Sequence, residues 1–245
     1  MPSTITAGII IIGDEILTGK VQDTNTFFLT RELRSRGVTV CRVSVIPDLI
    51  DEIACEVRNF SEKYDFVFTS GGIGPTHDDI TIEGVSRAFG VKTVISDVLQ
   101  KVLQQRFADL TPEQLKMAEV PEGSELIDEG DLKFPLIKFG NVFIFPGIPH
   151  LLIKKFHAIE KRFSGPSIYL RRIYFMESES VLACYLNEII AGDNGVKIGS
   201  YPAIGDEDYS VMVTLECTDE LRLDYATREL MARVLPEKIV RVSME

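Results

Sequence analysis

The sequence predicts an α/β domain built on a mainly parallel sheet, followed by a small two-layer α+β domain. The first observation is that strand-like and helix-like segments alternate through residues 7–89, an order typical of parallel sheets covered by helices. The second is a continuous apolar run at residues 7–12, which suits a strand buried on both faces. The third is the turn-rich segment Ser164, Gly165 and Pro166, after which the order of elements changes. We therefore place two domains at residues 1–165 and 166–245.

Turn residues separate the elements of the first domain. Gly37 ends the first predicted helix and Gly90 the third, and the pair Gly140-Asn141 suits the turn of a hairpin. In order, the predicted elements are strand 7–12, helix 25–36, strand 38–45, helix 50–60, strand 66–69, helix 79–89, helices 97–107 and 112–117, hairpin strands 134–139 and 141–145, and helix 150–163.

The second domain has a β-α-β-β-α-β order, which predicts a small two-layer sandwich. Its predicted elements are strand 168–175, helix 178–191, strands 196–200 and 209–216, helix 219–235 and strand 239–242.

The charge balance excludes some classes of partner. The formal net charge is −11 and the isoelectric point is near 4.9, so the surface repels a phosphate backbone and we expect no nucleic-acid partner. A small anionic substrate remains possible if local hydrogen-bond donors or a metal offset the repulsion from this negatively charged surface. The apolar run at residues 7–12 is too short to cross a membrane and lacks a basic leader, so we expect a cytoplasmic protein with no membrane partner.

The four cysteines form no metal-binding or disulfide pattern. Cys41, Cys55, Cys184 and Cys217 contain no CxxC pair and lie in strand-like or helical segments. We expect them to be reduced core residues, since no cysteine and histidine cluster has the spacing of zinc ligands.

The segment of residues 70–79 carries the strongest functional signal. It follows a buried strand and precedes a helix, where ligands bind in open α/β sheets. Glycines at such a place let the backbone approach a ligand, and their N–H groups suit a phosphate. The phosphate-binding candidates are Gly71, Gly72, Gly74 and the hydroxyl of Thr76.

Paired carboxylates end the same segment. Asp78 and Asp79 would repel a phosphate unless a divalent cation lay between them, and carboxylate and phosphate oxygens suit Mg²⁺. Asp14 or Glu15, which follow the first strand, is the candidate third carboxylate, because the ends of parallel strands meet at one sheet edge. The alternatives are that Asp79 caps the helix and that residues 13–15 form a turn.

Other polar residues near strand ends have equally plausible structural roles. Asp23 or Thr24 could cap the helix that begins at Asn25. Residues 146–149 form a rigid turn whether or not they wall the site. His77 lies beside the carboxylates, but an exposed loop histidine needs no functional explanation.

Four motifs together resemble a known family. They are residues 7–17 with Gly13-Asp14-Glu15, residues 22–28 with Asp-Thr-Asn, residues 71–79, and residues 145–149. This combination resembles the molybdopterin-binding-like domain of CinA-type proteins and of eukaryotic FAD synthases. Residues 198–202 resemble the small domain that follows it in CinA-type proteins.

The resemblance implies a fold, an activity and a cofactor. The fold would be a three-layer MogA/MoaB-like α/β domain. The activity would be pyrophosphatase activity on ADP-ribose or on FAD, which is cleaved to FMN and AMP. It would need a divalent metal, Mg²⁺ or Co²⁺, with K⁺ as a further candidate. By family analogy, the small domain would support a homodimer.

The resemblance also assigns residues. It makes Asp14, Glu15, Asp78 and Asp79 catalytic, with Asp14, Asp78 and Asp79 holding the metal. The substrate-binding set is Gly13, Asn25, Gly71, Gly72, Gly74, Thr76, Lys133, Pro146 and Gly147.

The sequence leaves three functions open. The first is FAD hydrolysis. The second is a nucleotide- or flavin-binding module without turnover, which would regulate a PAPS-reductase-like FAD synthase domain as its partner. The third is adenylyl transfer to a pterin, although nothing in the sequence selects a pterin. No motif of the domain that joins FMN to ATP occurs in these residues, so we expect them not to make FAD.

Overall fold

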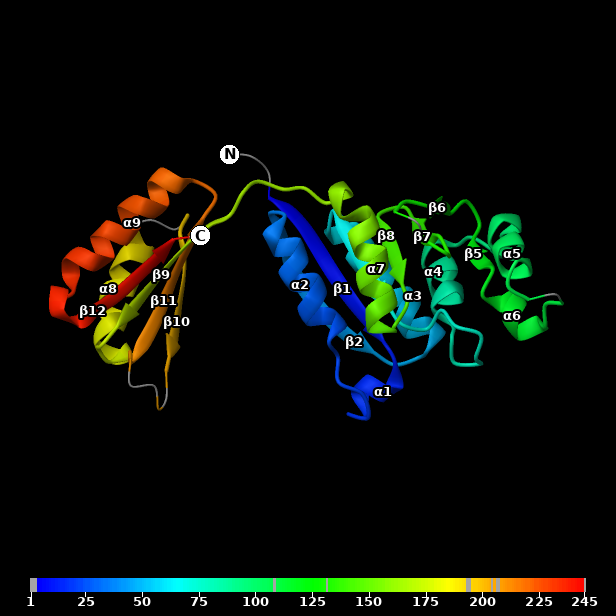
Figure 1. Cartoon of the computed structure of the whole chain (residues 1–245), viewed down its shortest axis with the longest axis horizontal. Coiled ribbons are helices and arrows are strands. Elements are labelled where there is room, and N and C mark those ends of the chain that lie inside the picture. Colours follow the sequence, from blue (N-terminus) through cyan, green and yellow to red (C-terminus); the bar gives the residue numbers. More distant parts are fainter. Residues whose placement is uncertain are drawn as a thin grey trace. The chain divides into compact units, whose positions relative to one another are not determined.

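The computed structural model describes residues 4–107, 109–130, 132–192, 195–203, 205 and 208–244. The chain divides into two compact units, Met1–Gly165 and Pro166–Glu245 (Figure 1). Each unit has its own hydrophobic core.

A six-stranded mixed sheet forms the centre of the first unit. Its order is β2-β1-β3-β8-β7-β6, in which β2, β1, β3 and β8 are mutually parallel and β7 is antiparallel to both of its neighbours. The mainly parallel sheet and the β7–β8 hairpin confirm the predictions. The strands are β1 (Ile5–Ile12), β2 (Val38–Ile46), β3 (Phe66–Ser70), β6 (Glu125–Ile127), β7 (Leu136–Phe139) and β8 (Val142–Phe145).

Helices cover both faces of this sheet and make three layers (Figure 1). On one face, α2 (Asn25–Ser35) and α7 (Pro149–Ile159) pack against Ile9 and Ile11 of β1. On the other face, α3 (Ile50–Lys63) and α4 (Thr81–Phe89) pack against Ile10 and Ile12. Successive side chains of a strand point to opposite faces, so β1 needs apolar residues at every position.

The remaining elements of the first unit are short. A side-chain capping box of Thr111 and Gln114, with Pro112 at the first helical position, starts α6. These elements are α1 (Asp14–Leu17), β4 (Thr93–Ile95), α5 (Asp97–Gln104), α6 (Pro112–Lys116), β5 (Glu119–Pro121), which pairs with β4, and the 3₁₀ turn η1 (Glu160–Arg162).

The second unit is a four-stranded antiparallel sheet of order β10-β11-β9-β12, packed against α8 and α9. This arrangement confirms the predicted two-layer α+β sandwich. Its elements are β9 (Tyr169–Phe175), α8 (Glu179–Gly192), β10 (Lys197–Pro202), β11 (Val211–Cys217), α9 (Glu220–Arg233), the 3₁₀ turn η2 (Pro236–Lys238) and β12 (Ile239–Met244).

Some predicted boundaries are wrong. The helix predicted from residue 79 begins at Thr81, because the Asp79 carboxylate accepts hydrogen bonds from Thr76 and closes a turn before the helix. The helix predicted to residue 107 ends at Gln104. The short elements α1, β4, β5 and β6 were not predicted, since three or four residues carry almost no periodic signal.

The prediction that the cysteines lie in the core is also wrong for three of them. Cys41, Cys55 and Cys184 are exposed and only Cys217 is buried. Cys41 lies in the exposed middle of the edge strand β2, and Cys55 follows the buried Ala54 on α3 and therefore faces outward. All four thiols are free, as predicted.

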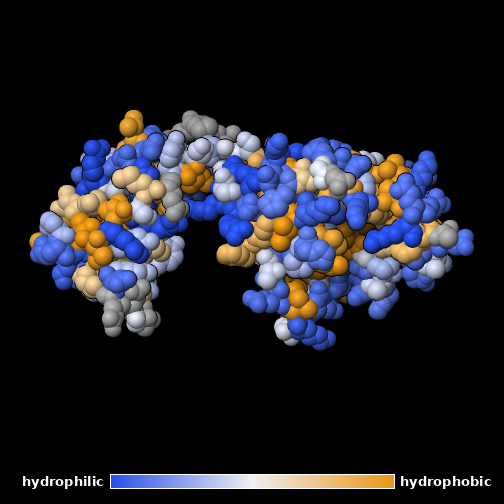
Figure 2. All heavy atoms as spheres, viewed as in Figure 1, coloured by the Kyte–Doolittle hydropathy of each residue, from blue (hydrophilic) through white to orange (hydrophobic). Residues whose placement is uncertain are grey.

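Hydrophilic side chains cover most of the face of each unit that Figure 2 shows, with apolar side chains exposed in small areas between them. Within the described part of the chain, every helix is too short or too polar to cross a membrane.

One buried arginine dominates the electrostatics of the second unit. Arg171 of β9 is only 4% exposed, and its Nη2 lies 2.8 Å from Oδ1 of Asp224 and 3.1 Å from Oε1 of Glu220. Its Nε also donates to Oδ1 of Asp224 at 3.1 Å. The two carboxylates on α9 therefore hold the helix against the sheet and neutralise the buried cation.

We expect Asp224→Ala to lower the free energy of unfolding of the second unit by about 1–3 kcal/mol, because it leaves a buried guanidinium without its main partner. Urea denaturation measures this loss. Glu188→Ala is the control, since Glu188 forms a more exposed pair with Arg233 and should cost less than about 1 kcal/mol. Equal losses in the two variants would contradict this account of Arg171.

Candidate active site

The candidate site lies where the parallel strands of the first unit end. The carboxyl ends of β1, β2, β3 and β8 reach the same sheet edge, and residues 13–18, 47–49, 71–80 and 146–148 follow them there. Ligands of open α/β sheets bind at this edge. The fold thus brings three of the four sequence motifs to this edge directly, and Asn25 of the fourth motif reaches it from α2.

Two glycines form the floor of the site. Gly71 has φ +113°, and a Cβ there would lie 2.0 Å from the carbonyl oxygen of Ile12. A Cβ on Gly147 would lie 3.3 Å from Cα of Gly71. The ends of β1, β3 and β8 therefore approach one another with no side chain between them, as only glycine permits.

Asn25 fastens this floor from α2. The residue is buried, and its Nδ2 donates to the carbonyl oxygen of Gly147 at 2.7 Å and to Oγ of Ser70 at 3.0 Å. Ser70 Oγ in turn donates to the carbonyl oxygen of Pro146 at 3.3 Å. The Asn25 Oδ1 is buried and has no hydrogen-bond partner among the described residues.

The first half of the glycine loop is tied to the start of α4. Thr81 donates its backbone N–H to the carbonyl oxygen of Gly72 and its buried hydroxyl to that of Gly71, both at 2.9 Å. Gly72 has φ +63°, and a Cβ there would lie 2.3 Å from the Thr81 hydroxyl. This half of the loop has a fixed backbone.

The second half is held by one of the predicted metal ligands. Oδ2 of Asp79 accepts hydrogen bonds from the Thr76 backbone N–H at 2.8 Å and from its hydroxyl at 2.5 Å. A Cβ on Gly74 would lie 2.6 Å from the same oxygen. The polar groups of Asp79 and Thr76 thus bond to each other within the loop. Asp78, by contrast, is exposed at the tip of the loop. The pKa of Asp78 is lowered, chiefly by the Thr76 hydroxyl, with smaller effects of His77 and Lys116.

A further carboxylate, Asp48, joins this edge and was missed in the sequence analysis. It follows β2, and its Oδ2 accepts a hydrogen bond from the Asp14 backbone N–H at 2.9 Å. Burial raises the pKa of Asp48, and the negative charges of Glu15, Asp14 and Asp78 raise it further, against the lowering effect of the Asp14 N–H. Four carboxylates from three loops therefore repel one another here, and a divalent cation would relieve this repulsion.

These carboxylates do not form a preassembled metal centre. Among the described residues, the only set of three metal-ligating groups within 4.8 Å of one another is Glu32, His157 and Glu160. That set encloses Arg36, whose guanidinium lies 2.9 Å from Glu32 and 2.6 Å from Glu160. The arginine already supplies the cation, so we interpret this set as an ion-pair network. At the sheet edge, a cation would have to draw the exposed Asp14, Glu15 and Asp78 inward.

The raised pKa of Asp48 gives a pH prediction for the metal-free protein. The ionised form is disfavoured in the folded state, so its cost is absent at low pH and appears as pH rises through the folded pKa. We expect Asp48→Asn to raise the melting temperature in EDTA at pH 7 and to give little gain near pH 3.5. Glu52→Gln, at an exposed carboxylate of α3, should show no such pH-dependent gain. An equal shift at both pH values would refute the electrostatic explanation.

Lys116 is hydrogen-bonded to the glycine loop. The sequence did not predict this contact. Its Nζ donates to the carbonyl oxygen of Thr76 at 2.6 Å. Lys133, the basic residue that the resemblance selects, is exposed and lies next to Phe134. No hydrogen bond or ion pair joins Lys133 to the loop among the described residues, and its role in ligand binding stays a prediction.

Two predicted alternatives concern helix starts. The Asp23 carboxylate accepts hydrogen bonds from the backbone N–H (3.0 Å) and the hydroxyl of Thr26, so it stabilises the first turn of α2. The N-cap position is occupied by Thr24, whose side chain makes no capping hydrogen bond, so Asp23 just before it satisfies the first turn instead. Gly13 donates its N–H to Ile46 at 3.2 Å and links the ends of β1 and β2.

The fold and the candidate site define a class of protein: a three-layer α/β domain with a glycine-rich loop and carboxylates at one sheet edge. Residues 8–164 match the family model described as "Probable molybdopterin binding domain", and residues 167–243 match "FAD synthase, middle domain". The chain therefore belongs to the family of probable molybdopterin-binding domains, followed by a FAD synthase middle domain.

Individual relatives agree with this assignment. A "Probable FAD synthase" of Caenorhabditis elegans is 31% identical over 264 residues, covering 95% of this chain and 51% of that protein. The chain thus spans about half the length of this relative. A protein of Archaeoglobus fulgidus is 34% identical, covering 90% of this chain and 94% of its own. The crystal structure of the protein CinA with unknown function from Thermoplasma acidophilum matches with a TM-score of 0.60 and 34% identity, over 65% of this chain and 99% of that one.

Proposed function

We propose that the first unit hydrolyses the diphosphate of FAD to FMN and AMP with the help of a divalent cation, Mg²⁺ or Co²⁺. The observation that carries this proposal is the meeting of an amide-rich glycine loop with Asp14, Glu15, Asp48 and Asp78 at one sheet edge. The similarity to FAD synthases and CinA-like proteins supports a nucleotide as the ligand.

The residues of the site fit such a cation. Their donors are carboxylate oxygens, which Mg²⁺ prefers, and the negative charges of Glu15, Asp14 and Asp78 add to the burial that raises the pKa of Asp48. When bound, the cation would polarise phosphoryl oxygens and lower the pKa of a bound water.

The chain itself would supply binding, orientation and a proton acceptor. The N–H groups of the glycine loop would bind phosphoryl oxygens on which charge develops. Asp48, the half-buried carboxylate at this edge, would accept the proton of the attacking water. The water oxygen would form a bond to one phosphorus while the bond from that phosphorus to the bridging oxygen breaks, which yields FMN and AMP.

The test is to incubate the purified chain with FAD and either Mg²⁺ or Co²⁺ and to follow FMN and AMP by chromatography. We expect both products in equal amounts, and none in EDTA. Cleavage of ADP-ribose but not of FAD would show that ADP-ribose, and not FAD, is the substrate. FAD binding in calorimetry without products under either metal would make the unit a regulatory binding module and refute the hydrolase proposal.

A further inference from the structure

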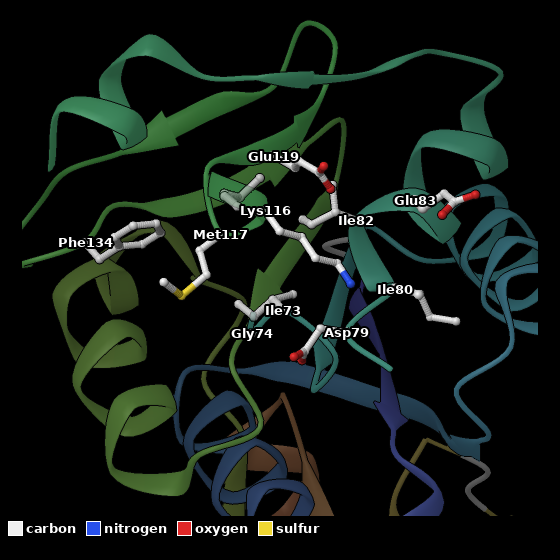
Figure 3. A pocket seen from close by; sticks show the side chains of 11 residues that line it. Ile73, Gly74, Asp79, Ile80, Ile82, Glu83, Lys116, Met117, Glu119 and Phe134 are labelled. Carbon is white, nitrogen blue, oxygen red and sulfur yellow. The ribbon is translucent and has the colours of Figure 1, made fainter. Parts of the chain in front are cut away.

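A small pocket beside the glycine loop contains a lysine that the proposed mechanism does not use (Figure 3). The volume of the pocket is about 60 Å³, and apolar side chains form much of its wall. Among the described residues that line it, the ionisable ones are Asp79, Glu83, Glu119 and Lys116. Three carboxylates share the pocket with one ammonium, so the pocket does not suit an anion, and Lys116 offsets part of their charge.

The ammonium of Lys116 reaches from α6 to the second half of the loop. Figure 3 shows the side chain extending towards Asp79, and its Nζ donates to the carbonyl oxygen of Thr76 at 2.6 Å. The same carbonyl oxygen accepts the backbone N–H of Asp79 at 3.2 Å, and Asp79 Oδ2 accepts the backbone N–H of Thr76 at 2.8 Å. Thr76 and Asp79 therefore close a turn, and Lys116 ties this turn to α6.

The helix that carries Lys116 is well anchored for this task. The capping box of Thr111 and Gln114 fixes its start. Leu115 and Met117, on either side of Lys116, pack against the hydrophobic core on the α3 and α4 face of the sheet. The position of the ammonium is therefore set by the fold and not by the loop that it contacts.

The tie to α6 bears on Asp78, the exposed candidate metal ligand. Asp78 lies inside the turn that Thr76 and Asp79 close, whereas Thr81 fixes the first half of the loop at Gly71 and Gly72. The two halves are thus held by different elements, α4 and α6. The place of Asp78 relative to the amides of the first half depends on the hold that Lys116 has on Thr76.

We propose that Lys116 is a positioning residue of the site, which holds the turn at Thr76 and so keeps Asp78 where the divalent cation binds. The proposal rests on the proposed function and adds a residue that acts through Thr76 and touches neither the cation nor the substrate. Its lysine is supplied by α6, an element outside the four strand ends that form the site.

Lys116 has two opposite effects on a cation at this edge. Its positive charge repels the cation, so loss of the charge alone would tighten cation binding. Its hydrogen bond orders the turn that carries a ligand, so loss of the bond would weaken cation binding. The proposal requires the second effect to exceed the first, and the direction of the change therefore decides between a positioning residue and a mere counter-charge.

The test measures Co²⁺ binding to the whole chain by calorimetry, without FAD. We expect Lys116→Met to weaken Co²⁺ binding by about 10-fold, the lower end of the range for residues that orient metal ligands. Lys116→Arg should stay within about 3-fold of the starting protein, because a guanidinium also donates to a carbonyl oxygen. Lys101→Met is the matched control: Lys101 is an exposed lysine of α5 that does not line the pocket, and its loss should change binding by less than about 3-fold.

Hydrogen exchange in EDTA gives a second readout that needs no metal. The amides of residues 73–79 should exchange faster in Lys116→Met than in Lys116→Arg, while the amides of α2 stay unchanged. If Lys116→Met fails to fold, Lys116→Gln keeps a polar side chain that is one bond shorter and should show the same two effects.

The outcomes separate this proposal from the proposed function. Unchanged or tighter Co²⁺ binding in Lys116→Met, or unchanged exchange of the loop amides, would overturn the positioning role even in a protein that cleaves FAD. Lys116-dependent Co²⁺ binding in a protein that does not cleave FAD would refute the proposed function and leave the positioning role intact. A starting protein that binds no Co²⁺ would refute both.

Discussion

Asp78→Asn is expected to lower metal-dependent FAD hydrolysis by roughly 100-fold or more, because loss of a metal ligand removes several kcal/mol of transition-state stabilisation. Asp78 is exposed at the tip of the loop and lies close enough to Asp48 to raise its pKa. Of the two adjacent aspartates, Asp78 is the one that can move towards a cation without releasing the Thr76 backbone N–H. The rate of FMN release at saturating FAD, measured over a range of Mg²⁺ concentrations, checks this expectation.

The matched control is His77→Ala. His77 is adjacent to Asp78, its side chain is 98% exposed, and its Nδ1 lies 3.8 Å from an Asp78 oxygen, so its removal changes little except a weak pair. We expect His77→Ala to keep the activity within about 3-fold of the starting protein. If Asp78→Asn also stays in this range, Asp78 holds no essential metal.

Asp79 should behave differently from Asp78, although the two residues look alike in the sequence. The Asp79 carboxylate holds Thr76, and Lys116 holds the same residue from the other side. Asp79→Asn would therefore lose activity through a loosened loop, and faster proteolysis at residues 74–79 would accompany that loss. Asp78→Asn should leave proteolysis unchanged, which separates a ligand from a loop-holding residue.

The comparison of the two aspartates shows how far sequence reasoning reaches. The pattern of residues 7–12 predicts β1 correctly, because a strand buried on both faces must be apolar at every position. The same reasoning places Asp14 and the glycine loop at one sheet edge. It cannot tell which of two adjacent carboxylates faces solvent, since that depends on the hydrogen bonds of Thr76.

Asp48 and Lys116 were missed for a different reason. Asp48 follows a proline before a helix, where an aspartate is an ordinary turn residue. Lys116 meets Thr76 across 40 positions of sequence, and a single exposed-looking lysine at the end of a short helix carries no local signal of that contact. The position of Asp48 does carry a signal, because the residue follows β2, the strand next to β1. A carboxylate at that place is expected to lie at the same sheet edge as Asp14.

The close approach of the strand ends at Gly71 gives the prediction with the largest effect on stability. A Cβ at Gly71 would lie 2.0 Å from the Ile12 carbonyl oxygen and 3.1 Å from its carbonyl carbon, both in the backbone of β1. No side-chain rotation can relieve this overlap, and φ of +113° is a conformation that residues with a side chain rarely adopt. We expect Gly71→Ala to lower the free energy of unfolding of the first unit by about 3–5 kcal/mol.

Gly90→Ala separates the two causes. Gly90 ends α4 with φ +67°, and a Cβ there meets no atom within 4 Å, so its variant should lose only about 1 kcal/mol for the backbone conformation. Urea denaturation of both variants gives the difference, which isolates the contact between β1 and β3. Equal losses would mean that the ends of β1 and β3 can move apart to accommodate a side chain. The bonds of Asn25 to Ser70 and Gly147 would then hold together strand ends that are otherwise free to shift. A difference of several kcal/mol would instead show that the floor beneath the phosphate loop is rigid before any ligand binds.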